Sequence, residues 1–115
     1  MNIEELRDYC IAKKGVTESF PFDETTLVFK VANKMFALVS MDNDPLTINL
    51  KCDPEKAILL REEYEAVKPG YHSNKRHWNT VTVGQVRKNL EQEWIDDSYN
   101  LVVESLPKKT KSELL

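Results

Sequence analysis

Glycine is scarce in this sequence, with 3 residues among 115. A phosphate-binding loop, a dinucleotide-binding fingerprint and the nucleophile elbow of hydrolases each need at least two glycines within a few residues of one another. The glycines here, Gly15, Gly70 and Gly84, lie far apart in the chain. These classes of active-site loop are therefore excluded.

Cysteines and long apolar segments are also scarce. Cys10 and Cys52 are the only cysteines, and two widely spaced cysteines do not indicate a disulfide framework. Residues 1–5 have neither the basic start nor the apolar run of a secretory leader. No apolar run approaches the roughly 18 residues that a membrane-spanning helix needs. We therefore expect a cytoplasmic protein with reduced thiols and no membrane contact.

The composition is that of one folded domain. Of the 115 residues, 41% are hydrophobic and 30% are charged, which suits a chain that buries a single core. We expect residues 1–106 to form this domain. Residues 107–115 include Lys108, Lys109 and Lys111, and we expect them to be a flexible basic tail.

Capping patterns and hydrophobic periodicity predict helices alternating with groups of strands. Capping patterns precede three predicted helices: Asn2 with Glu5, Asp53 before Pro54, and Thr82 with Gln85. In chain order we expect a helix over 3–14, a packed link over 16–24 that contains Phe20 and Phe22, and strands over 25–31, 35–41 and 46–51. A helix over 54–64 that packs through residues including Ile58 follows, then a strand or loop at 71–72, a strand over 77–82, and a helix from about 83 to 106.

Strands joined this tightly favour antiparallel pairing with the helices on one face. The sequence therefore predicts an α+β two-layer sandwich of order α-β(3)-α-β(2)-α.

The strand over 77–82 has two faces of different character. Trp78 and Thr80 lie on one face, and Asn79, Val81 and Val83 lie on the other. The valines favour burial of their own face, which would require hydrogen-bond partners for Asn79, whereas the bulk of the indole favours the opposite assignment. Periodicity does not choose between them. We expect Trp78 to be largely buried, because an exposed indole is uncommon on a small acidic protein.

Functional side chains concentrate between Gly70 and Thr80, a stretch that holds both histidines, one of the two tryptophans and two adjacent cations. This stretch lies within residues 66–90, which contain no Asp or Glu, although the whole chain has a net charge of −3. The cations of this window are Lys68, Lys75, Arg76, Arg87 and Lys88. The sequence thus predicts a local concentration of positive charge on an acidic protein.

Several interpretations of this stretch remain open. Its cations suit phosphates and its rings suit unpaired bases, which favours nucleic acid. The same groups suit a small anion, and they also suit a protein partner. A metal site is disfavoured, because His72 and His77 have no cysteine or acid close by in the sequence. A Ser73–His72 catalytic pair is disfavoured, because adjacent side chains on an extended chain point apart.

Three segments resemble the bacterial MmcQ/YjbR-like family. They are Glu18-Ser19-Phe20-Pro21-Phe22, the hairpin 26–38, and the long motif from Tyr71 to Val81, whose composition is unusual. The resemblance covers about residues 1–106. Asp23 stands where the family often has glycine, and Ser73 where it often has methionine.

The resemblance implies the same α-β(3)-α-β(2)-α order, similar to secretion chaperones. Members of the family are often described as candidate DNA-binding proteins with a winged arrangement, and no reaction is firmly attached to the family. The motif positions imply a shared site of Tyr71, His72, Asn74, Lys75, His77, Trp78 and Asn79. Charge adds Arg76, Arg87 and Lys88 to these candidates.

Our leading hypothesis is a protein that binds nucleic acid, such as DNA, weakly and in a salt-sensitive way through residues 71–79, without catalysis. The alternative is a pocket for a small anion or a peptide, with the Asn, His and Lys side chains converging under the Trp78 ring. Neither hypothesis calls for a cofactor or a metal ion.

Overall fold

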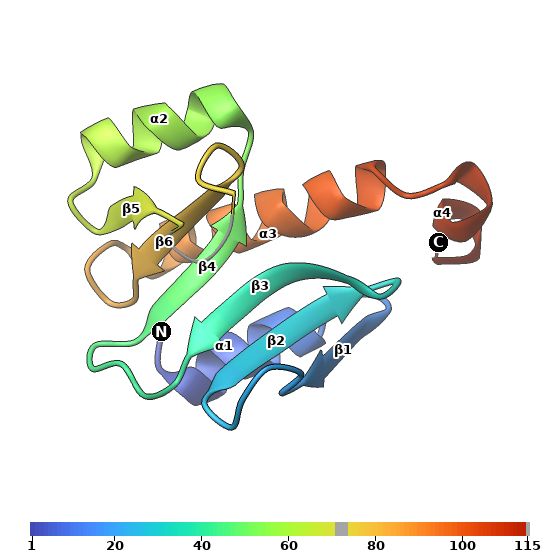
Figure 1. Cartoon of the computed structure of the whole chain (residues 1–115), viewed down its shortest axis with the longest axis horizontal. Helices are drawn as coiled ribbons and strands as arrows, with labels where there is room; N and C mark the ends of the chain where they lie inside the picture. The colour runs from blue at the N-terminus through green and yellow to red at the C-terminus, as the bar shows by residue number, and fades with distance from the viewer. Residues whose placement is uncertain (71–73, 115) are drawn as a thin grey trace.

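The computed structural model describes residues 1–70 and 74–114. The helices and strands follow one another along the chain as Figure 1 shows. The helices are α1 (Ile3–Ile11), α2 (Pro54–Glu63), α3 (Lys88–Glu104) and α4 (Lys108–Leu114), and the strands are β1 (Val16–Ser19), β2 (Thr26–Val31), β3 (Lys34–Ser40), β4 (Thr47–Lys51), β5 (Val67–Pro69) and β6 (Trp78–Thr82).

The strands form one antiparallel sheet in the order β1-β2-β3-β4-β6-β5. The β2–β3 hairpin turns at Ala32 and Asn33, both with positive φ, as expected of the two central residues of a type I′ turn. α2 connects β4 to β5, and β6 then returns between them. The predicted α+β class and antiparallel sheet are confirmed.

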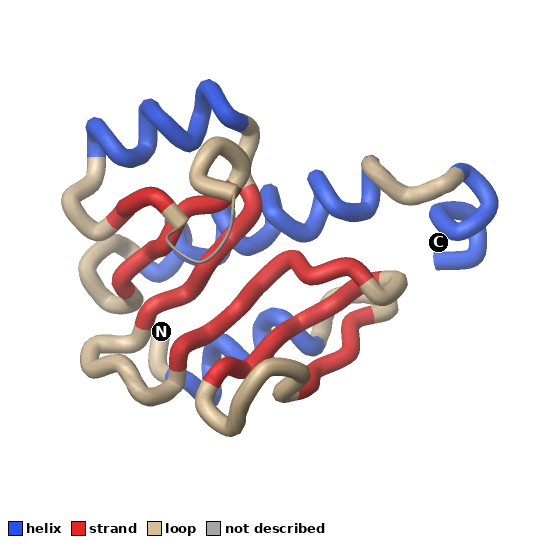
Figure 2. Tube along the Cα trace, viewed as in Figure 1, coloured by secondary structure: helices blue, strands red, loops and turns tan. Residues whose placement is uncertain are grey.

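The helices α1, α2 and α3 cover one face of the sheet, in agreement with the prediction (Figure 2). α3 contacts β3 and β4. Leu60 of α2 and Trp94 of α3 meet over Leu50 and Val81, which places both helices on the same side. The core between the layers includes Leu6, Cys10, Leu27, Phe29, Val39, Ile48, Leu50, Val81, Trp94, Ile95 and Val102.

Ser98 ties α3 to the sheet at the point where β3 and β4 separate. The last residue pair between these strands is Ala37 with Leu50. Just beyond it, the Ser98 Oγ accepts a hydrogen bond from the Lys51 backbone N–H at 2.8 Å and donates one to the Phe36 carbonyl oxygen at 2.6 Å. One buried hydroxyl thus satisfies two backbone groups that no longer reach each other.

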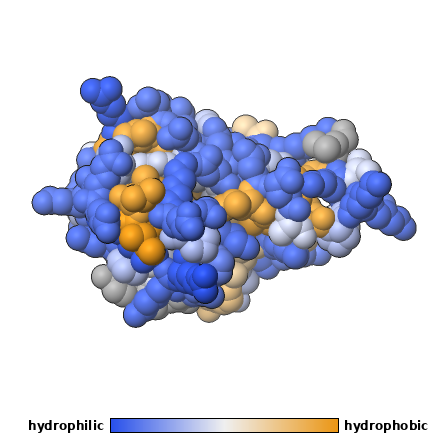
Figure 3. All heavy atoms as spheres, turned by 90° about the horizontal axis from the view of Figure 1, so that it is seen from above, coloured by the Kyte–Doolittle hydropathy of each residue, from blue (hydrophilic) through white to orange (hydrophobic). Residues whose placement is uncertain are grey.

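Three local expectations are wrong. The link over 16–24 begins with a strand, β1, which pairs with β2 through Val16 and Val31. Phe20 and Phe22 in this link are 48% and 63% exposed, so they do not cover the core. Ile58 on α2 is also exposed rather than packed, and with the exposed Leu59 it contributes to the apolar surface at the α2 end of the molecule (Figure 3).

The start of the last long helix also differs from the prediction. The capping pattern of Thr82 with Gln85 does not open a helix, because Thr82 belongs to β6 and pairs with Thr47. The helix α3 begins at Lys88, after Arg87, with no side-chain cap. By contrast, the Asn2 capping box and the Asp53 cap are present as predicted.

The C-terminal residues form a helix where the sequence predicted a flexible tail. In α4 the Lys111 ammonium lies 3.1 Å from the Glu104 carboxylate. Leu114 packs against the core, close to Gly15. No helix within residues 1–70 and 74–114 has the length and apolar character needed to cross a membrane.

We predict that Ser98→Ala lowers the free energy of unfolding by about 1–3 kcal/mol, because the variant leaves two buried backbone groups without their partner. Ser105→Ala is the matched control, since the Ser105 hydroxyl binds only the nearby Val102 carbonyl. We expect the control to change stability by less than about 0.5 kcal/mol. Urea unfolding followed by tryptophan fluorescence measures both, and equal effects would contradict the bridging role of Ser98.

Candidate functional site

The segment from Asn74 to Trp78, called the corner below, is a tight turn that leads into β6. The Asn74 side-chain oxygen accepts from the Arg76 backbone N–H at 2.9 Å. The Asn74 carbonyl oxygen accepts from the N–H groups of His77 and Trp78, each at 3.0 Å. Asn74, Lys75 and Arg76 are exposed. The turn therefore presents both cations to solvent on a hydrogen-bonded backbone.

Arg61 of α2 fastens the corner to the helix layer. Its Nε donates to Asn79 Oδ1 at 2.6 Å. Its Nη2 donates to the backbone carbonyl oxygens of Lys75 and Trp78. One planar guanidinium thus holds both sides of the turn, a geometry that lysine cannot reproduce.

Asn79 has a structural role, not the ligand-binding role that the sequence predicted. Its side chain is on the helix side of β6 and is 2% exposed. Besides accepting from Arg61, it donates to the Ala57 carbonyl oxygen at 3.3 Å. The cavity beside Asn79 has a volume of about 10 Å³, room for about one water molecule. Asn79 is therefore not accessible to a ligand.

Trp78 lies on the opposite side of β6 from Asn79 and is intermediate in burial, neither fully buried nor exposed. It pairs with Lys51 across the strands. Gly70 lies against its backbone and donates from its N–H to the Trp78 carbonyl oxygen at 2.9 Å. A Cβ at Gly70 would lie 2.8 Å from the Trp78 Cβ, so this close approach requires glycine. Trp78 and Asn79 cannot line one pocket.

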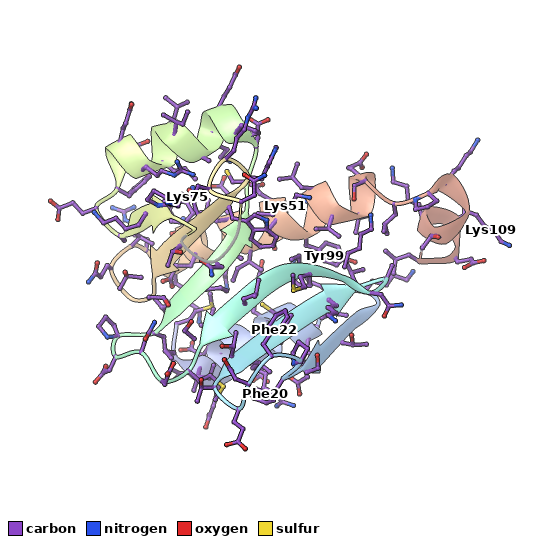
Figure 4. All side chains as sticks on the ribbon, viewed as in Figure 1. Phe20, Phe22, Lys51, Lys75, Tyr99 and Lys109 are labelled. Atoms are coloured by element: carbon purple, nitrogen blue, oxygen red, sulfur yellow. The ribbon has the colours of Figure 1, made fainter. Side chains whose placement is uncertain are left out.

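Trp78 belongs to the open face, by which we mean the side of the sheet turned away from α1, α2 and α3. The pairing register places these residues on it: Thr17, Ser19, Thr26, Val28, Lys30, Met35, Leu38, Ser40, Thr47, Asn49, Lys51, Lys68, Trp78, Thr80 and Thr82. None of these strand residues is acidic, and the charged ones are Lys30, Lys51 and Lys68. The corner, which carries Lys75 and Arg76, leads into Trp78, the cross-strand partner of Lys51, and Figure 4 shows Lys75 at this end of the face.

At the other end of the open face, the sheet and two loops form a hollow of about 500 Å³. Met35, Leu38 and Asn49 line it from the strands, Phe22 and Asp23 from the loop before β2, and Asp42 and Asn43 from the loop after β3. Thr25, Thr26 and Ser40 complete the lining. In Figure 4, Phe20 and Phe22 lie over the same side of the sheet as Lys51 and Lys75.

Asp23 fixes the shape of the loop that carries Phe22. Its Oδ1 accepts from the backbone N–H groups of Thr25 and Thr26, at 2.9 Å and 2.6 Å. The hydrogen bond from Thr25, followed by that from Thr26, lowers the pKa of the Asp23 carboxyl. The carboxylate is therefore charged at neutral pH and committed to the turn.

The remaining predicted residues lie apart from the corner or outside the described residues. Arg87 and Lys88 follow the far end of β6, and the Lys88 ammonium lies 2.7 Å from Glu5 on α1, in the helix layer. The structure does not bring them together with Lys75 and Arg76. Tyr71 and His72 lie outside the described residues, and His77 is partly buried at the end of the turn.

Reactive groups offer little chemistry in the described residues. Burial raises the pKa of the Cys10 thiol to about 12 and also raises the pKa of Cys52. Both thiols are free, and protonated thiols are poor nucleophiles at neutral pH. In the part of the chain that the structure describes, no group of three or more His, Cys, Asp and Glu side chains is arranged to hold a metal ion.

Lys51, Phe22 and Arg61 were not among the residues that sequence reasoning selected. Lys51 and Phe22 come from segments distant from the corner in sequence. The sheet register places Lys51 on the open face, and Phe22 lies in the loop before β2 that lines the hollow on that face. A signal for Arg61 existed: an asparagine in line with Val81 and Val83 needs a buried partner. The sequence did not indicate which residue supplies it.

Comparisons with known proteins give one consistent result. The YjbR family description matches residues 11–101. The chain is 35% identical to the uncharacterized protein YjbR of Escherichia coli (strain K12), over 100% of this chain and 98% of that protein. It is 41% identical to the uncharacterized protein YbdF of Escherichia coli O157:H7, over 83% of this chain and 79% of that protein.

Two solved structures are similar over most of the chain. The crystal structure of Deinococcus radiodurans protein DR2400, described as a DUF419 domain, matches with a TM-score of 0.93 and 41% identity, covering 98% of this chain and 87% of that one. A Pseudomonas syringae protein matches with a TM-score of 0.76 and 28% identity, covering 88% of this chain and 98% of that one.

We predict that Asn79→Ala lowers the free energy of unfolding by about 1–3 kcal/mol, because it removes the partner of a partly buried guanidinium and of the buried Ala57 carbonyl. Asn74→Ala is the matched control, since Asn74 is exposed and bonds only within the turn, and about 0.5 kcal/mol or less is expected. Urea unfolding of both variants decides the assignment. A harmless Asn79→Ala would restore Asn79 as a candidate ligand-binding residue.

Proposed function

The chain belongs to the YjbR family, and from this premise we propose that the protein binds nucleic acid, without catalysis, through the corner and the open face. The observation that carries the proposal is the absence of carboxylates from the strand residues of the open face, which nevertheless holds Lys30, Lys51 and Lys68. A face of this kind attracts phosphates even on an acidic protein.

The acidic total does not argue against this interface, because several acids lie in the helices or on the helix-covered side of the sheet and are paired there. Ion pairs join Arg7 to Glu18, Lys13 to Asp96, Lys56 to Asp97 and Lys88 to Glu5. These carboxylates are neutralised locally, on the side away from the open face. At physiological salt the screening length is about 8 Å, so a phosphate responds mainly to the charges near it.

Trp78 and Lys51 supply two kinds of contact side by side. They are cross-strand partners, so their side chains leave the sheet on the same face with Cβ atoms about 5 Å apart. The partly exposed indole offers a surface for stacking on a base, and the ammonium offers a phosphate contact. Arg76 lies exposed at the turn that precedes Trp78. This combination of ring and cation suits a nucleotide strand better than an isolated anion.

We expect modest affinity with a shallow salt dependence, because only a few phosphates are contacted, so binding is measurable mainly at low ionic strength. In the double variant Lys51→Ala/Arg76→Ala, two phosphate contacts are lost. We expect the affinity to fall roughly fivefold for each lost contact, because two unit charges in contact in water attract each other by about 1 kcal/mol. The slope of log K against log salt should become shallower by about 0.7 per contact for a single strand. Fluorescence anisotropy with labelled oligonucleotides at several low salt concentrations measures both quantities.

The matched control is Lys108→Ala/Lys109→Ala, which removes the same charge from α4, away from the corner (Figure 4). We expect this control to bind like the unmodified protein. Equal losses in both double variants would show that total charge, not the open face, determines binding. No binding to single- or double-stranded oligonucleotides at tens of micromolar would reject the proposed function.

A further inference from the structure

The hollow at the far end of the open face has the size and lining of a small-molecule site. Its volume of about 500 Å³ is within the range of roughly 300–1,000 Å³ that such sites occupy. Met35 and Leu38 form an apolar floor, and Phe22 stands at the rim with 63% of its surface exposed. A ring this exposed on a loop contributes little to the core.

The polar groups of the hollow are mostly neutral. They are the hydroxyls of Thr25, Thr26 and Ser40 and the amides of Asn43 and Asn49. Amides and hydroxyls form hydrogen bonds to the edges of nucleobases, whose faces are apolar and flat. Lining of this kind suits a flat heteroaromatic ring with donors and acceptors around its edge, and suits an aliphatic chain poorly.

We propose that the hollow accepts an unpaired nucleobase, so that the nucleic acid bound by the open face is single-stranded. This inference rests on the proposed function and specifies its ligand. Phe22 stacks on the base, Met35 and Leu38 contact its other face or edge, and the amides pair with its polar edge. A base in a duplex is stacked and paired, and it does not enter such a hollow without leaving the helix.

Neighbouring residues of the open face connect the hollow to the corner. The Asn49 side-chain oxygen accepts a hydrogen bond from the Thr80 hydroxyl, and Thr80 lies two residues from Trp78 on the same face. Asn49 likewise lies two residues from Lys51, about 7 Å along β4. Successive nucleotides of an extended strand are separated by similar distances. One strand can therefore stack on Trp78, pass Lys51 with its phosphates, and place a base in the hollow.

The two carboxylates of the hollow fit a base better than a phosphate. Asp23 is held by backbone N–H groups of its own loop, and Asp42 lies in the exposed loop after β3. A carboxylate accepts from the amino group of cytosine and repels phosphate. The charges thus assign the phosphates to the Lys51 end and the base to the hollow.

The test compares Phe22→Ala with Phe20→Ala in the full chain. Phe20 is in the same loop and is 48% exposed, but it does not line the hollow. Because both rings are exposed and neither is charged, neither variant should change the net charge or the cooperative unfolding. Anisotropy titrations use a single-stranded oligonucleotide, the same strand with abasic positions, and a hairpin duplex of the same length. A second measurement follows free nucleosides at millimolar concentration by the methyl NMR signals of Met35 and Leu38.

We expect Phe22→Ala to weaken single-strand binding by about 5- to 150-fold, the factor expected for loss of one base stack, with an unchanged salt dependence. Phe22→Tyr should restore binding, and Phe20→Ala should leave it unchanged. The abasic strand should bind the unmodified protein at least as weakly as the intact strand binds Phe22→Ala, because it also loses the base that stacks on Trp78. The hairpin duplex should be bound more weakly than the single strand.

The contrary outcomes separate this inference from the proposed function. If oligonucleotides bind but Phe22→Ala has no effect, or if the duplex binds as well as the single strand, the inference is overturned and the proposed function stands. If no oligonucleotide binds but free nucleosides shift the Met35 and Leu38 methyl signals, the hollow takes a base from a free nucleoside and the proposed function fails. If neither probe binds, both are overturned.

Discussion

The helices α1, α2 and α3 all cover the same face of the sheet. Because side chains alternate along a strand, this arrangement assigns every strand residue either to the core or to the open face. In β6 it buries Asn79 and Val81 and turns Trp78 and Thr80 outward. The features that support binding on the open face follow from this division, because the acids needed for helix ion pairs lie on the other side.

Two buried polar interactions make the one-sided arrangement possible. Ser98 replaces a missing strand contact where β3 and β4 separate, and Arg61 supplies the partners that a buried Asn79 and the turn at the corner need. Each interaction joins a helix to the sheet at a place where the backbone alone would leave groups unsatisfied. Arg61 also connects stability to function. The guanidinium that donates to the buried Asn79 side chain also donates to the backbone of the turn that carries Lys75 and Arg76. Replacement of Arg61 is therefore expected to affect both.

Local signals in the sequence were sufficient where a few neighbouring residues determine the structure, as in the Asn2 and Asp53 caps. They failed where pairing with a strand distant in the sequence determines the local structure. The pattern at Thr82 resembles a cap, but pairing with Thr47 keeps it in a strand, and β1 exists because β2 pairs with it. For the site, the motif located the corner, but periodicity did not determine the orientation of Trp78. Lys51 joins the site through the sheet register, and Phe22 joins it through the loop before β2.

The central claim is that nucleic acid binds the open face rather than the basic surface as a whole. Amide NMR signals of the ¹⁵N-labelled protein, recorded during titration with a short single-stranded oligonucleotide at low salt, test it directly. The account predicts that the signals that change belong to the corner, to the open-face residues Lys51 and Thr80, and to the loop that carries Phe22. Changes confined to α4 and to the segment around Arg87 and Lys88, with the open face unaffected, would contradict it.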